Sequence, residues 1–125
     1  MKRELILVLI TVSIIALCCD EEMHYEFIIE NSCKSELIVN LKPNGDNEKT
    51  ISIAKEKADT VYDFTIIEGM HIDEKKIDKI FTYINIQCNT IPSKIDYLSN
   101  EVWYYDKKSE SHAVYYLEVD STHFE

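Results

Sequence analysis

Glycine and proline are scarce in this chain, with 2 residues of each among 125. A loop that cradles phosphate groups needs several glycines, so the sequence excludes a P-loop and a glycine-rich dinucleotide-binding turn. It also lacks the Gly-x-Ser-x-Gly pattern of a nucleophile elbow. We therefore expect neither a nucleotide cofactor nor a serine hydrolase of that type.

Histidine is also rare, and the four residues are far apart: His24, His71, His112 and His123. None stands at the spacing that is typical of a metal site. The sequence therefore predicts no metal, no cofactor and no enzyme. A small hydrolase with a carboxylate pair stays open as an alternative, because the distance between two carboxylates in space decides such a site.

Basic side chains are outnumbered, with 13 lysines and arginines against 23 acidic residues and a net charge of −10. Binding of nucleic acid depends on basic side chains that displace counterions from phosphates. We therefore predict no nucleic-acid partner. The same charge disfavours direct contact with an anionic lipid surface.

The chain begins with an apolar run over residues 5–17, preceded by Lys2 and Arg3. A basic start followed by 7–15 apolar residues is typical of a signal peptide, whereas a transmembrane helix needs about 20. We predict that residues 1–18 are a signal peptide, residues 19–23 an acidic linker and residues 24–125 one domain. A retained membrane helix is the weaker interpretation.

The apolar run ends at Cys18 and Cys19, and an acidic run, residues 20–22, follows. This arrangement resembles a bacterial lipoprotein precursor, in which the cysteine after the cleavage site carries acyl chains such as palmitate. Cys19 fits better than Cys18, because a small residue is favoured before the acylated cysteine and Leu17 is large. The resemblance implies a membrane anchor, and several acyl chains hold a protein firmly. An ordinary secretory signal is the alternative.

Two further cysteines, Cys33 and Cys88, lie in the predicted domain. In an oxidising compartment an isolated pair favours a disulfide. Two free thiols are the alternative. A zinc site is disfavoured, because no Cys-x-x-Cys pair supplies further ligands.

Apolar residues alternate along most of the domain, which predicts strands with one buried face. Tyr25, Phe27 and Ile29 begin this pattern, and we expect the first two strands to form a hairpin. Between residues 73 and 81 the period changes to that of a short helix, with Asp73 as N-cap. The predicted strands are residues 24–30, 36–41, 49–53, 60–67, 82–88, 94–98 at an edge, 101–105 and 112–119.

About seven short strands with one helical turn predict an all-β fold, an antiparallel, immunoglobulin-like β-sandwich. A small closed barrel is the alternative. The chain also resembles small Bacteroidetes lipoproteins with β-sandwich ectodomains of unassigned activity. The acidic run after Cys19 is similar to their export signal, which implies the outer membrane or cell surface. Further similarity lies in Phe27-Ile28-Ile29-Glu30-Asn31, Lys79-Ile80-Phe81 to Ile86, Trp103, Tyr115-Tyr116-Leu117-Glu118-Val119 and Phe124.

Three aromatic residues, Trp103, Tyr104 and Tyr105, follow one another and place rings on both faces of one predicted strand. An exposed ring can stack on a sugar or anchor a protein partner. The alternative, which we favour for Trp103 and the inward tyrosine, is that the rings fill the core. The sequence thus predicts a membrane-anchored binding or scaffold module, with an envelope protein or glycan as ligand and no indication of oligomeric state.

Overall fold

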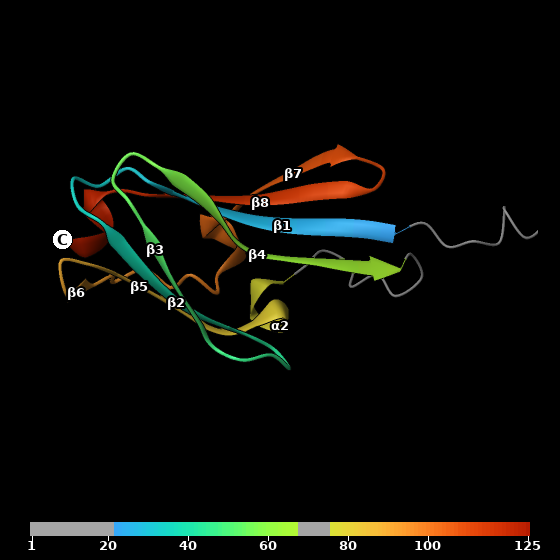
Figure 1. Cartoon of the computed structure of the whole chain (residues 1–125), viewed down its shortest axis with the longest axis horizontal. Helices are drawn as coiled ribbons and strands as arrows, with labels where there is room; N and C mark the ends of the chain where they lie inside the picture. Colours follow the sequence, from blue (N-terminus) through green and yellow to red (C-terminus); the bar gives the residue numbers. More distant parts are fainter. Residues whose placement is uncertain (1–21, 68–75) are drawn as a thin grey trace, which may run out of the picture.

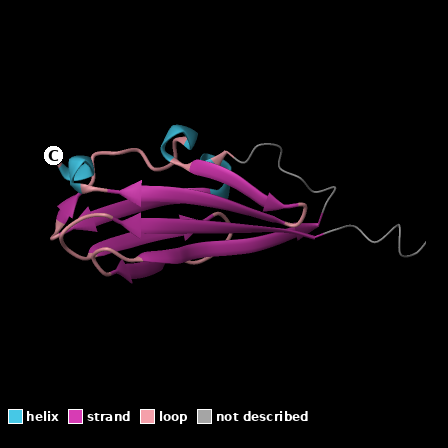
Figure 2. Cartoon of the chain, turned by 90° about the horizontal axis from the view of Figure 1, so that it is seen from above, coloured by secondary structure: helices cyan, strands magenta, loops and turns pink. Residues whose placement is uncertain are grey.

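The computed structural model describes residues 22–67 and 76–125. Within them, two four-stranded sheets pack face to face (Figures 1 and 2). The first sheet has the order β4 (Ala58–Ile67), β1 (Glu22–Asn31), β8 (His112–Val119) and β7 (Tyr104–Ser109). The second sheet has the order β3 (Lys49–Ile53), β2 (Leu37–Pro43), β5 (Phe81–Cys88) and β6 (Ile91–Pro92). The predicted all-β sandwich is confirmed.

The first sheet contains one pairing that the sequence did not suggest. β1 and β8 run parallel, whereas the other pairings of described strands are antiparallel. With four strands in each sheet, the layout also differs from the four-plus-three arrangement of immunoglobulin constant domains. The parallel pair brings the N-terminal and C-terminal strands together at the centre of the first sheet.

Strict alternation along β1 and β2 decides which of their side chains form the core. Tyr25, Phe27 and Ile29 have no exposed surface, and the intervening residues face outward. Leu37, Val39 and Leu41 are equally buried on β2, as predicted.

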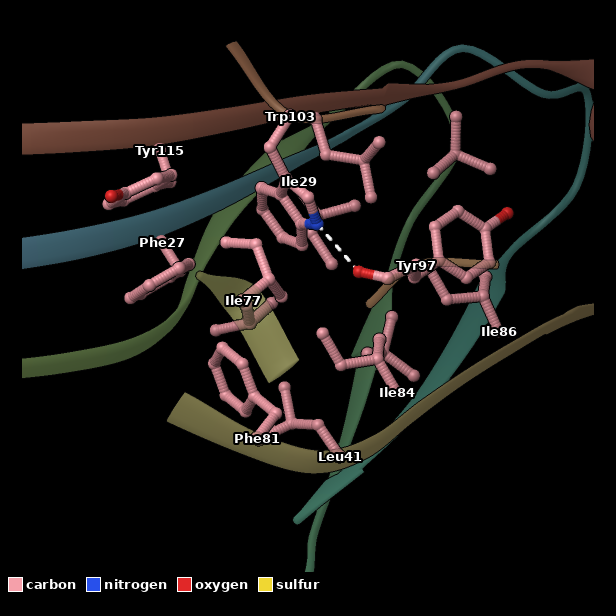
Figure 3. Packing of buried hydrophobic residues seen from close by; sticks show 14 of the residues in the cluster. Phe27, Ile29, Leu41, Ile77, Phe81, Ile84, Ile86, Tyr97, Trp103 and Tyr115 are labelled. Atoms are coloured by element: carbon pink, nitrogen blue, oxygen red, sulfur yellow. Dashed lines mark hydrogen bonds between the residues drawn. The ribbon is translucent and has the colours of Figure 1, made fainter. Parts of the chain in front are cut away.

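Aromatic rings pack together with aliphatic side chains at the centre of the sandwich (Figure 3). Phe27 stacks on Tyr115 with ring centroids 4.7 Å apart, and it meets the edges of Phe81 at 5.0 Å and Trp103 at 5.6 Å. Trp103 Nε1 donates a hydrogen bond of 2.8 Å to the carbonyl oxygen of Tyr97. Such edge and offset contacts add to the burial of apolar area, so this cluster joins the two sheets.

The expected hairpin of the first two strands is wrong, because β1 and β2 belong to different sheets. The buried side chain of Asn31 stabilises the crossing between them. Its Nδ2 donates to the carbonyl oxygens of Ser35 (2.8 Å) and Ile53 (3.0 Å), and its Oδ1 accepts from the backbone N–H of Cys33 (2.8 Å). The side-chain amide of Asn31 thus fixes the backbone where the chain passes from the first sheet to the second.

The second correction concerns the edge strands. The predicted edge strand at residues 94–98 is wrong, and β6 lies at Ile91–Pro92 instead. Asn89 and Thr90 have φ values of 50° and 67°, the left-handed conformation that folds a chain straight back into a hairpin. β6 therefore begins earlier than the apolar pattern suggested.

The remaining boundaries differ in detail. The strand predicted at residues 101–105 is instead the 3-10 turn η1 (Asn100–Val102) followed by β7, which extends to Ser109, beyond the predicted end of the strand. β1 begins at Glu22, inside the predicted linker. The helical segment is the single turn α2 (Ile77–Ile80), and its predicted N-cap, Asp73, lies outside the described residues.

The C-terminal end is closed by a second 3-10 turn, η2 (Ser121–Phe124). In the described ranges, no helix combines the length and apolar character needed to cross a membrane. The predicted anchor cysteines, Cys18 and Cys19, lie outside these ranges.

Candidate binding groove on the first sheet

A groove of about 570 Å³ lies on the outer face of the first sheet, over β1, β8 and β7. These three strands lie side by side at the top of Figure 1. Their outward side chains form two rows that cross the sheet. The first row is Ile28, Tyr116 and Tyr104, and the second row is Glu26, Val114 and Asp106.

The first row supplies a mostly apolar surface. Ile28 and Tyr116 are half-buried, and Tyr104 is the most exposed member, with 67% of its surface accessible. Val114, in the second row, is nearly buried although it points away from the core. These outward side chains lie on the opposite face of the sheet from the inter-sheet core and form the apolar floor of the groove.

The second row and its neighbours supply charge. Glu26 Oε1 lies 3.7 Å from Nε2 of His112, and Glu26 Oε2 accepts a hydrogen bond of 3.2 Å from Thr60. On the other side of Val114, Asp106 accepts from Nζ of Lys108 at 2.6 Å. This hydrogen bond raises the pKa of Lys108. A carboxylate with a basic side chain beside it thus borders the groove on each side.

The hydroxyl of Tyr116 is fixed by a hydrogen bond that it donates to Glu30. This bond, followed by burial, raises the pKa of Tyr116 to about 12. The phenol is therefore neutral at physiological pH, and its ring is held in place along the groove.

The structure separates the three predicted aromatic residues. Trp103 is 7% exposed and belongs to the core, as favoured from the sequence. Tyr104 lines the groove, whereas Tyr105 points to the opposite side of the sheet, where its ring lies 5.0 Å from that of Tyr115. Tyr105 is 42% exposed because β7 is at the edge of the sheet. One of the three candidates therefore reaches the groove.

Sequence reasoning missed the other groove residues. A signal was available, because Ile28 and Val114 are apolar at positions that alternate with the buried face of their strands. What the alternation does not reveal is that these positions are neighbours, since that depends on the parallel pairing of β1 with β8.

The predicted cysteine pair does come together, at the end of the sandwich where β5 finishes and η2 lies. Both Cys33 and Cys88 are free thiols in this structure, so the predicted bridge is not present in it. Burial, followed by the charge and hydrogen bond of Cys88, raises the pKa of Cys33 to about 11. The Cys33 thiol also lies 3.7 Å from the carbonyl oxygen of Val119.

Histidines do not assemble a metal centre in the described part of the chain. The rings of His24 and His112 lie 5.6 Å apart, and Nδ1 of His24 is 3.0 Å from the hydroxyl of Thr65. No group of three or more His, Cys, Asp or Glu side chains suited to a metal ion occurs among residues 22–67 and 76–125.

Comparisons with protein families, with curated proteins and with solved structures identify no protein similar to this chain. The similarity to Bacteroidetes lipoproteins therefore stays a prediction from the residues quoted above.

Proposed function

We propose that this chain is an exported lipoprotein, anchored by acyl chains on Cys19, whose β-sandwich binds a ligand at the outer membrane or cell surface. The observation that carries the binding role is the exposed ring of Tyr104 beside the outward apolar side chains of Ile28 and Val114. An apolar surface bordered by charged groups is the usual composition of a recognition site.

The groove favours binding over catalysis. General acid or base catalysis works best with a pKa near the operating pH. The largest pKa shifts in the described residues lead away from neutral pH, since the pKa values of Cys33, Tyr97 and Tyr116 are raised to about 11 or 12. The alternative hydrolase would use Glu26 and Asp106, but both carboxylates already have partners: Glu26 accepts a hydrogen bond from Thr60 and lies 3.7 Å from Nε2 of His112, and Asp106 is paired with Lys108.

A disulfide between Cys33 and Cys88 is part of this proposal. Both cysteines line the same small pocket at one end of the sandwich, and the charge of Cys88 contributes to the raised pKa of Cys33, which supports their pairing. On export, thiol–disulfide exchange would transfer two electrons from the pair to the disulfide of an oxidoreductase. The sandwich loses two protons and gains one S–S bond, and the oxidoreductase becomes a dithiol.

A photo-crosslinking residue tests whether the groove is occupied in living cells. We would replace Tyr104 with p-benzoylphenylalanine in the full chain, irradiate cells and look for a shift in mass. The matched control carries the same residue at position 105, which is exposed on the opposite face of the same strand.

The proposal predicts an adduct at position 104 and little at position 105. Equal adducts at both positions would indicate nonspecific contact. Absence of an adduct at position 104 would refute a binding role for the groove.

A further inference from the structure

We infer that the ligand of the groove is a glycan, a hydroxyl-rich sugar chain without strong negative charge; this inference rests on the proposed binding role. The apolar surface of the groove has a shape that suits a sugar ring. Tyr104 presents a ring to solvent at one end of the row that continues through Tyr116 to Ile28. A pyranose ring has a flat face of C–H groups, which matches the face of an aromatic ring.

The polar border of the groove offers hydrogen-bonding partners for sugar hydroxyls. The carboxylates of Glu26 and Asp106 lie on both sides of Val114, and a carboxylate accepts hydrogen bonds from hydroxyl donors. Lys108 and His112 supply nitrogen donors beside them. A sugar hydroxyl both donates and accepts, so it can use both kinds of group at once.

Charge disfavours an anionic ligand. Two carboxylates border the groove, and the chain carries a net charge of −10, so a polyanion would be repelled over the whole surface. A nucleic acid or a heavily sulfated polymer is therefore a poor match. A neutral or weakly charged glycan meets no such barrier.

The position of the groove disfavours a peptide that binds as an added strand. Such a peptide needs the free hydrogen-bonding edge of a sheet. This groove instead crosses the face of three paired strands, and β8 at its centre is hydrogen-bonded to β1 on one side and β7 on the other. Recognition there must come from side chains. The volume of about 570 Å³ lies in the range of small-ligand sites and suits a short segment of a glycan.

Affinity electrophoresis of the purified protein tests the inference. The native gels would contain, one at a time, xylan, mannan, a soluble β-glucan, arabinogalactan and desialylated mucin. We expect at least one to retard the protein. Tyr104→Ala should weaken that interaction about tenfold, and Asp106→Asn should weaken it severalfold, whereas Tyr105→Ala should change it less than twofold.

Thermal unfolding is the control for correct folding of the variants. Tyr104 and Tyr105 are both exposed, so neither substitution should lower the melting temperature by more than a few degrees. The inference is overturned if no polysaccharide retards the protein, or if Tyr105→Ala weakens binding as much as Tyr104→Ala. When the crosslinker at position 104 gives a protease-sensitive, glycosidase-resistant adduct, the ligand is a protein: the glycan inference falls and the binding role stands. Absence of any adduct removes both.

Discussion

Reduction of the proposed Cys33–Cys88 bridge should destabilise the exported protein strongly. The bridge would close a loop of about 55 residues, which restricts the unfolded chain much more than the folded one. In the chain-entropy model this contributes about 4 kcal/mol to the free energy of unfolding. Small domains have a total stability of about 5–15 kcal/mol, so the bridge would supply a large share.

Urea unfolding followed by Trp103 fluorescence measures this contribution. With a urea dependence of about 1–2 kcal/mol per molar, the midpoint should fall by about 2–4 M when the protein is reduced. The double variant Cys33→Ala/Cys88→Ala is the matched control, because a reductant has no bridge to cleave in it. Its midpoint should be the same with and without reductant.

Two results would refute the reasoning. The first is a denatured, unreduced protein that still reacts with two equivalents of thiol reagent at Cys33 and Cys88. The second is a bridged protein whose midpoint does not respond to reduction, which would mean that the unfolded state gains as little freedom as the folded one.

Three further predictions concern the fold. Asn31→Ala should lower the free energy of unfolding by about 2–4 kcal/mol, because three hydrogen bonds are lost, two of them buried and one part-buried; a loss below about 1 kcal/mol would contradict the crossing role of Asn31. Trp103→Phe should cost about 1–3 kcal/mol through the lost hydrogen bond to Tyr97 and the unfilled volume; because this variant lacks the single tryptophan, urea unfolding is followed by circular dichroism for it and for wild type, and an unchanged midpoint would argue against the prediction. Stability should decline between pH 10 and 12, because Tyr97 and Tyr116 have pKa values of about 12 in the folded chain and about 10 when unfolded. The unfolded state then releases protons first, so urea midpoints should fall as pH rises through this window; constant midpoints would refute it.

Local features of the fold were predictable because burial imposes a period of two on each strand. Tyr25, Phe27 and Ile29 on one side of β1, and Leu37, Val39 and Leu41 on β2, indicated strands and buried faces directly. No local pattern records which strands are neighbours. β1 follows the same alternation whether it pairs with β2 or with β4 and β8.

The errors arose where one side chain overrides the pattern. As a polar residue, Asn31 is expected to end a strand at the surface. It is instead fully buried, and its three side-chain hydrogen bonds fix the crossing from one sheet to the other. Asn89 and Thr90 adopt left-handed backbone conformations without a glycine, so the hairpin of β5 and β6 has no strong sequence signal.

The groove was predictable only in part. Tyr104 was a candidate, and its exposure on the outer face agrees with a ligand-stacking role. Its neighbours in the groove, Ile28 and Tyr116, lie on two other strands. The three residues form a row because β1, β8 and β7 are adjacent. A surface assembled from strands near both ends of the chain can be recognised only once the structure is known.

Metabolic labelling with palmitate tests the central claim of a lipid-anchored binding module most directly. The protein would be expressed with its own residues 1–21, and wild type would be compared with Cys18→Ala and Cys19→Ala. We expect label in wild type and in Cys18→Ala, and its loss in Cys19→Ala. Wild-type protein without label, or label that survives Cys19→Ala, would contradict an anchor at Cys19.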